Sequence, residues 1–483
     1  MPVVFDVYHV IPPALDITRS GAVDFARTNF PLSHIYYASN FMILDISGLS
    51  YARLFPTIMV SIIVLALFSL GRRISKTWAV IAPIFFLSMN WYMEYHLCRQ
   101  AFGVMVWLTF FFLLYLTLEE RNISLGILAG IILACMLLSH PGVIIISMFN
   151  LISLSVLAAV IYIKDREPGY LWPVIPFFAF FGVSLLVAYY MVPEINQFFT
   201  SLYEGVISGG FRGFSTGGPS ETSPAYALTN TIRRMMGVTQ SLLALAGGYI
   251  LFRRKDHSIR ALFIGTWFIS CYFWLGYSLT HNGFLIERSF LTALLPASIL
   301  AIPIFMFLKE RWDRGLDIRS LHISIYVTKT AIIGVVLMIV MMSVLIPIAK
   351  NSVDSFETPS RQTYEAGRFT QENTGGRVWV MDTHEGLFRY LESTSNSTVS
   401  FRSRRSHHPD QGGSGMTFGY PYPSLENPNL PKLMFTDYFN NYLEVRYGNT
   451  TYSRDIRNYE KDIARATSCL YDSGGSRVYF RNP

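Results

Sequence analysis

The strongest constraint on this chain is a series of apolar stretches long enough to cross a membrane. A helix that spans about 30 Å of hydrocarbon needs about 20 residues. Charged residues make up only 15% of the chain, against about 25% in an average soluble protein. We therefore predict an α-helical polytopic membrane protein of about ten transmembrane helices, at roughly 51–70, 77–93, 100–117, 123–139, 141–163, 171–192, 236–252, 260–279, 289–308 and 323–348.

The distribution of Lys and Arg predicts the orientation of these spans. Cytoplasmic loops of membrane proteins are enriched in both residues, and one set of alternate loops holds most of them, at 71–76, 119–122, 164–170, 253–260 and 309–319. We expect this set to be cytoplasmic. The protein would then lie in the cell membrane with residues 1–50, 193–235 and everything after 349 outside the cytoplasm. The net charge of +7 reflects these loops and does not indicate a nucleic-acid partner.

The predicted spans and their orientation divide the chain into three parts. Residues 1–50 form a first external segment, 51–348 the transmembrane helical domain, and 349–483 an external C-terminal domain. The last is polar, and its strand-like runs RVWVMD, STVSFR and SRVYF predict a small α/β or β-rich domain. Because no span precedes residues 1–50 to carry them outside, we expect the parent protein to have a further first helix.

The external segment 193–235 contains a glycine-rich stretch, Ser208–Ser220. Such a stretch has too much backbone freedom to hold one conformation without a partner. It is consistent with a disordered connector and equally with a mobile loop that orders over a substrate.

The first external segment holds ionisable residues of the kinds that carry acid–base chemistry. Asp6 and His9 are three residues apart and would share a face of a helix, and His34 follows in the run NFPLSH. A carboxylate beside a low-dielectric membrane surface can act as a general base when a neighbouring His or cation supports it. The alternative is that these are ordinary solvated polar residues.

A second set lies where the spans meet the outer surface. Glu94, His96 and Arg99 occur in WYMEYHLCRQAFG, and Arg288 follows THNGFLIE. Ionisable groups at span ends commonly mark a site, and arginine can bind a phosphate with two parallel hydrogen bonds. The alternative is an interfacial cap and a membrane anchor without substrate.

The spans themselves contain almost no charge, which disfavours a transporter with ionisable groups at the membrane midplane. A site at the outer surface that combines a carboxylate with cations suits a substrate with a lipid tail and a phosphate head. Four cysteines without metal-ligand spacing indicate neither a zinc site nor a disulfide framework.

The first external segment also carries a recognisable pattern: D-x-x-H, a glycine about twelve residues on, then N-F-P-x-x-H before an apolar helix. This pattern resembles the first outer loop of archaeal polytopic glycosyltransferases of the GT-C superfamily, relatives of protein O-mannosyltransferases and oligosaccharyltransferases. The SHPG turn, the run ERSFL and the ending SCLYDSGGSRVYF also fit. The matching positions are Asp6, His9, Gly21, Asn29, Phe30, Pro31 and His34.

The resemblance implies transfer of a sugar from a polyprenyl (dolichyl)-phosphate donor to a protein or lipid-linked glycan acceptor. Asp6 would be the catalytic base. His9 and His34 would position Asp6, the acceptor or a divalent cation. The donor would be bound by Glu94, His96, Arg99 and Arg288, with the phosphate on the two arginines.

Mn²⁺ or Mg²⁺ would suit these His and Asp ligands only loosely. Two departures from the family pattern are the missing helix before the acidic segment and the lack of an Asp-Glu or Asp-Asp doublet. The alternative from another class is a non-catalytic membrane scaffold or a carrier of lipid-linked sugars.

Overall fold

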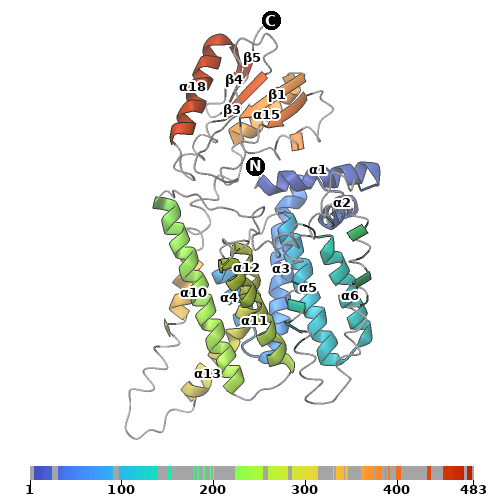
Figure 1. The fold of residues 1–483 in the computed structure, drawn as a ribbon, viewed down its shortest axis with the longest axis vertical. Helices are drawn as coiled ribbons and strands as arrows, with labels where there is room; N and C mark the ends of the chain where they lie inside the picture. Colours follow the sequence, from blue (N-terminus) through green and yellow to red (C-terminus); the bar gives the residue numbers. More distant parts are fainter. Residues whose placement is uncertain are drawn as a thin grey trace.

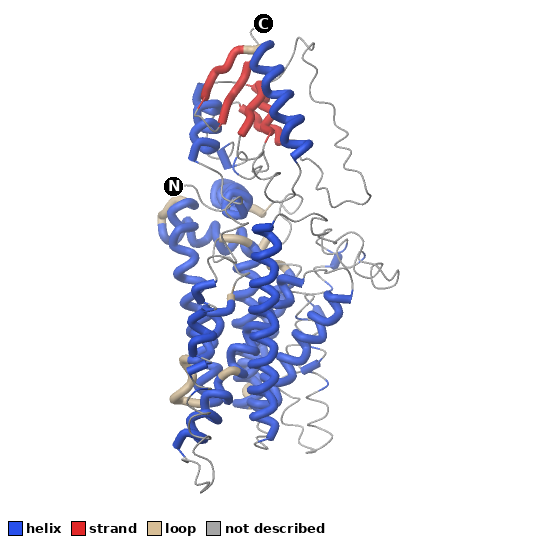
Figure 2. The backbone as a smooth tube through the Cα atoms, turned by 90° about the vertical axis from the view of Figure 1, so that its left-hand side faces the viewer, coloured by secondary structure: helices blue, strands red, loops and turns tan. Residues whose placement is uncertain are grey.

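The computed structural model describes twelve continuous segments and scattered positions at 147–200, 330–345 and 387–391. The segments are 5–23, 31–90, 97–139, 224–253, 259–280, 286–313, 361–373, 376–381, 399–403, 432–436, 450–472 and 476–480. The elongated molecule has a helical bundle, two helices at one end of it, and a β-sheet beyond them (Figures 1 and 2).

The bundle helices run along the long axis of the molecule (Figure 2). In the described part of the chain, four helical stretches are long and apolar enough to span a membrane, at Gly48–Ile74, Arg99–Glu120, Thr231–Arg253 and Leu291–Glu310. The chain is therefore a multi-pass membrane protein. The bundle consists of α3 (Gly48–Ile74), α4 (Ile81–Met89), α5 (Arg99–Glu120), α6 (Ile123–Leu137), α10 (Pro224–Arg253), α11 (Ile259–Thr280), α12 (Ile286–Leu300) and α13 (Ile302–Asp313).

Two of the predicted boundaries differ from the structure. α10 begins at Pro224, inside the segment 193–235 that we assigned to a loop. The span predicted at 77–93 contains a helix of only nine residues, α4. The span predicted at 289–308 matches the apolar stretch Leu291–Glu310, within which two helices meet at Ala301. The glycine-rich stretch and most of the predicted spans at 141–163, 171–192 and 323–348 lie outside the described residues.

The break between α12 and α13 has a local cause. Pro303 has no N–H to donate to the carbonyl four residues back, and the next amide, that of Ile304, bonds instead to the carbonyl of Ala301 at 3.2 Å. Gly247 of α10 packs against this break. A Cβ at that position would lie 1.8 Å from the carbonyl oxygen of Leu300, so the close approach requires glycine.

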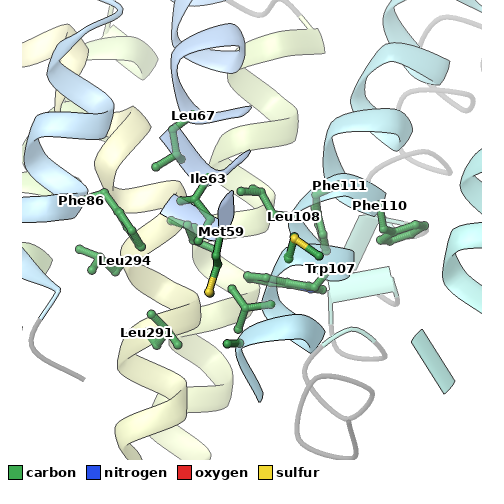
Figure 3. Close-up of a cluster of buried hydrophobic side chains, with 14 of the residues drawn as sticks. Met59, Ile63, Leu67, Phe86, Trp107, Leu108, Phe110, Phe111, Leu291 and Leu294 are labelled. Carbon is green, nitrogen blue, oxygen red and sulfur yellow. The ribbon is translucent and has the colours of Figure 1, made fainter. Parts of the chain in front are cut away.

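The bundle core is built from large apolar side chains. Figure 3 shows side chains of α3, α4, α5 and α12 converging between the helices. Trp107 of α5 and Trp267 of α11 are fully buried, and Trp267 stacks on Phe111 with ring centroids 4.6 Å apart. Burial of aromatic rings of this size makes a large contribution to packing.

Two helices of the first external segment lie at one end of the bundle, where α1 (Phe5–Ser20) runs crosswise to α3 (Figure 1). α1 buries Val7, Val10, Ile11 and Ala14, and this three- and four-residue spacing is that of one helix face. Ile11 lies against the start of α3, where a Cβ on Gly48 would come within 2.8 Å of it.

The C-terminal residues form a five-stranded mixed sheet in the order β2-β1-β3-β5-β4. β1 pairs in parallel with β2 and β3, and β5 pairs antiparallel with β3 and β4. The runs RVWVMD, STVSFR and SRVYF supply β1, β2 and β5. The bounds are β1 (Gly376–Met381), β2 (Val399–Ser403), β3 (Lys432–Thr436), β4 (Ser468–Asp472) and β5 (Ser476–Phe480).

Helices cover the two faces of this sheet (Figure 2). Val478 packs with Ala366 of α15 (Arg361–Asn373) in one buried cluster. Its neighbours Arg477 and Tyr479 point to the opposite face, since strand side chains alternate, and there both contact Glu460 of α18 (Thr450–Ala466).

The sheet, α1 and α2 lie at the same end of the bundle (Figure 1). Leu49, near the start of α3, packs against the sheet cluster, and Tyr390 packs against both clusters. At the opposite end, Arg73 in the last turn of α3 pairs with Glu119 of α5 at 3.1 Å. The basic last turn of α3 therefore faces away from the sheet.

Candidate functional site

The helix α2 (Leu32–Leu44) joins the external segment to the bundle. The backbone amide of Leu32 donates to the carbonyl of Leu138 at 3.0 Å, just beyond α6. The hydroxyl of Tyr37 donates to the carbonyl of Cys98 at 3.0 Å, at the start of α5. His34 contacts the carbonyl of Val10 in α1 at 3.3 Å. One short helix thus fixes α1 relative to α5 and α6.

The side chains of α2 that make these contacts lie on its buried face. His34 and Tyr37 are 2% and 0% exposed, and burial raises the pKa of Tyr37 well above its ordinary value, so the phenol keeps the proton that it donates. The ring of Tyr37 meets that of Phe55 edge-on at 5.5 Å. Ser33, also buried, has a hydroxyl oxygen without a hydrogen-bond partner within the described part of the chain.

His34 is held as a neutral ring. Burial, and after it the positive charge of Arg99, lower the pKa of His34 from 6.5 to about 4, while the contact with Val10 raises it to a lesser degree. A carbonyl oxygen can only accept, so the contact at Nδ1 is a hydrogen bond when Nδ1 carries the proton. In the neutral ring, Nε2 then holds a lone pair.

Pro12 and Pro13 interrupt the backbone bonding of α1 beside this contact. Neither has the N–H that would normally bond to the carbonyls of Tyr8 and His9. The next carbonyl along the chain, that of Val10, is the one that His34 contacts. The proline pair thus loosens α1 where α2 docks onto it.

Arg99 is the first residue of α5. It follows Cys98, whose sulfur caps the helix by accepting from the amide of Ala101 at 3.2 Å. A helix N-terminus carries partial positive charge and unpaired amides that favour anions. With the guanidinium of Arg99 added, this end of α5 is the electropositive part of the junction formed by α1, α2 and the start of α5, hereafter the outer junction.

The structure brings together part of the predicted site. His34 and Arg99 lie close enough for the charge of one to act on the other, and Asp6 and His9 lie in α1, which α2 contacts. Of the side chains of Asp6 and His9 nothing is described. Arg288 lies in the first turn of α12, again without a described side chain. Glu94 and His96 lie outside the described residues.

No group of three His, Cys, Asp or Glu side chains that could hold a metal ion occurs among the residues whose side chains the structure describes. The side chains of Asp6, His9, Glu94 and His96 are not among these residues. Where α2 meets the start of α5, the described side chains include the neutral imidazole of His34 and the guanidinium of Arg99, and a guanidinium suits an anion.

No pattern in the sequence indicates the contacts that organise this junction. Val10 and Cys98 contribute backbone carbonyls, which any residue has, and Tyr37 lies in an aromatic run that reads as membrane interface. A second polar cluster was also missed, inside the bundle, where Ser270 of α11 donates to Asn150 and the hydroxyls of Ser241 and Tyr272 lie 2.7 Å apart. These groups are uncharged and join helices across the bundle.

Comparison with known proteins finds solved structures of similar fold. No family model and no curated protein sequence matches the chain. Among solved structures, the chain is similar to the oligosaccharyltransferase of Archaeoglobus fulgidus, solved with a tethered acceptor peptide that contains the NVT sequon. The TM-score is 0.51 with 14% identity, over 99% of this chain and 70% of that one.

The chain is also similar to ArnT from Cupriavidus metallidurans, solved in the apo state and bound to undecaprenyl phosphate. The TM-score is 0.52 with 10% identity in both cases, over 98% of this chain and 93% of that one. The chain therefore shares the fold of these two proteins over nearly its whole length.

Proposed function

We propose that this protein is a membrane glycosyltransferase that transfers a sugar from a polyprenyl-phosphate donor to an acceptor on the outer face of the membrane. The observation that carries the proposal is the outer junction, where α1 with Asp6, α2 with His34 and the start of α5 with Arg99 converge within a GT-C fold.

In this mechanism Arg99 and the N-terminus of α5 bind the donor phosphate. The leaving phosphate gains negative charge as the bond to the sugar breaks, and fixed positive groups that already face it stabilise that charge. Arg288, in the first turn of α12, would add a second guanidinium. The binding of undecaprenyl phosphate by the ArnT neighbour supports a lipid phosphate as the donor class.

Asp6 in α1 would take the proton of the acceptor nucleophile. A carboxylate can do this when it lies within hydrogen-bond reach of the acceptor and near a low-dielectric surface. The tethered acceptor peptide of the A. fulgidus neighbour supports a protein acceptor, and a lipid-linked glycan is the other class we propose. We propose that His9 positions Asp6, the acceptor or a divalent cation (Mn²⁺ or Mg²⁺), and that Glu94 and His96 contact the donor.

The outward orientation belongs to the same proposal. The sheet and the outer junction lie at the end of the bundle opposite the basic turn that contains Arg72 and Arg73. Lys and Arg concentrate on the cytoplasmic side, so the junction would face outward, where a lipid-linked donor replaces a nucleotide sugar.

Arg99→Ala tests the donor site directly. In a purified-protein assay with a radiolabelled polyprenyl-phosphate sugar, we expect donor affinity to fall by about 10- to 100-fold, the loss typical of a hydrogen bond to a charged group. Arg19→Ala, an exposed arginine in the last turn of α1, is the matched control and should leave affinity unchanged. Equal donor affinity in the two variants would refute this role of Arg99.

A further inference from the structure

The last turn of α2 is exposed although it is entirely apolar. Met42, Ile43 and Leu44 follow one another at the end of the helix, and they are 55%, 79% and 45% exposed. Consecutive residues of a helix point in different directions about its axis, so this turn is exposed on more than one side. A contiguous apolar surface of this kind marks a contact with another protein or with a membrane.

The whole of α2 is free of charged residues. Between Leu32 and Leu44 the chain has no Lys, Arg, Asp or Glu, and Tyr37 and Phe41 are buried on the side that faces the bundle. Figure 1 shows α2 nearly end-on, whereas α3 and α5 run lengthwise. The axis of α2 therefore lies across the direction of the membrane spans, as in helices that lie in the plane of the membrane surface.

A sharp corner joins the exposed turn to a membrane span. Asp45 ends α2 in the left-handed conformation, with a φ of 49°, and Ser47 caps α3 by accepting from the amide of Ser50 at 3.2 Å. Only three residues separate α2 from Gly48, where the spanning helix begins. The exposed turn therefore lies where the chain enters the membrane.

The lipid-facing side of α3 continues this apolar surface beyond the corner. Exposed residues of α3 recur at 54, 57, 61 and 65, which is the spacing of one helix face, and Leu54 and Leu65 are 46% and 63% exposed. Because α3 is apolar and long enough to span a membrane, this face meets lipid. The exposed Arg53 marks the level of the headgroups, to which an arginine near the end of a span extends.

We propose that α2 is an interfacial helix whose last turn, Met42–Leu44, inserts into the leaflet on the side of the sheet, at the boundary between headgroups and acyl chains. The partner of this surface is membrane lipid and not a second protein chain. Since α2 contacts both α1 and the start of α5, its insertion holds the outer junction at the level of the headgroups. If the proposed function holds, the phosphate of a lipid-linked donor lies at this same level.

A nitroxide spin label at position 43 tests this placement without an assay of activity. The label is attached to Ile43→Cys in the whole chain, in nanodiscs of phosphatidylglycerol and phosphatidylethanolamine. Cys135→Ala and Cys469→Ser remove the two cysteines that are not buried. Collisions of the label with oxygen, which concentrates in lipid, and with a nickel chelate, which stays in water, report its depth.

Two further labels serve as references in the same background. Leu65→Cys places a label on the lipid-facing side of α3, and Asp16→Cys places one at an exposed position of α1. We expect the label at 43 to lose most of the nickel collisions seen at 16. It should collide with oxygen more often than the label at 16 and less often than the label at 65, since the boundary is shallower than the middle of a span.

Two results would overturn the proposal. Nickel collisions at 43 as frequent as those at 16 would show that the turn faces water. Protection from both reagents would show that a second copy or another protein chain covers it. The measurement needs neither donor nor sugar transfer, so either result leaves the proposed function standing, and a failure of sugar transfer leaves the contact of α2 with lipid standing.

Discussion

The bundle core and the outer junction are both buried, but different forces hold them. In the core, Trp267 stacks on Phe111 and meets Trp107 edge-on at 5.6 Å, through ring contacts that tolerate small shifts. In the junction, Nδ1 of His34 lies 3.3 Å from the carbonyl oxygen of Val10, and the hydroxyl of Tyr37 donates to the carbonyl of Cys98. Apolar packing depends on volume, while hydrogen bonds depend on direction. We therefore expect the core to set stability and the junction to set geometry.

The largest stability effect should come from the core. Trp267→Ala removes a fully buried indole and should lower the free energy of unfolding by about 3–5 kcal/mol. Trp267→Phe is the control, because it keeps a ring in the stack and removes an indole N–H that has no hydrogen-bond partner within the described residues. Thermal unfolding in detergent measures both.

Transfer per folded molecule should survive Trp267→Ala if the two regions have separate roles. A loss of specific activity as large as that of Arg99→Ala, with an unchanged unfolding midpoint, would contradict the division between core and junction.

A smaller effect should come from acid at the junction. The pKa of His34 is about 4 in the folded protein and near 6.5 when the chain is unfolded. Between these values the unfolded state binds a proton that the folded state does not, so stability should fall as pH falls from 6.5 to 4. Above pH 6.5 the ring is neutral in both states and contributes no slope.

The resulting loss in the free energy of unfolding would be roughly 3 kcal/mol. Unfolding midpoints measured from pH 7.5 to 4 should fall more steeply in the unchanged protein than in His34→Gln, because glutamine at position 34 does not titrate. Parallel curves for the two proteins would mean that His34 is not held neutral, and would make the junction resemble an ordinary solvated surface.

The sequence indicates the bundle well because membrane helices need long apolar runs. The predicted spans at 100–117 and 260–279 match α5 and α11 closely. The errors lie where hydropathy carries no information. The missing N–H of Pro303 breaks a uniformly apolar run into α12 and α13, and α10 continues beyond its apolar part into the polar segment that starts at Pro224.

The candidate site is only partly visible in the sequence. Arg99 could be selected because ionisable groups near span ends are costly without a purpose, and His34 because it follows Asp6 and His9 in the first segment of the chain. Their proximity could not be predicted, since they are far apart along the chain and come near each other through the contact of α2 with Cys98. The carbonyl that fixes His34 belongs to Val10, and no side-chain pattern signals it.

The central claim is that a carboxylate of the first external segment performs the chemistry, and Asp6→Asn tests it most directly. The change keeps size and shape and removes the charge. The matched control is Asp16→Asn, an exposed residue of the same helix. Both proteins would be assayed for sugar transfer from a radiolabelled polyprenyl-phosphate donor, with donor affinity measured in parallel.

We predict that Asp6→Asn lowers transfer by a factor on the order of 10²–10⁴, the usual contribution of a positioned acid or base. Donor affinity should change little, because we assign the phosphate contacts to Arg99 and Arg288, and Asp16→Asn should transfer sugar as the unchanged protein does. Undiminished transfer by Asp6→Asn would contradict the mechanism and make Glu94 the next carboxylate to replace.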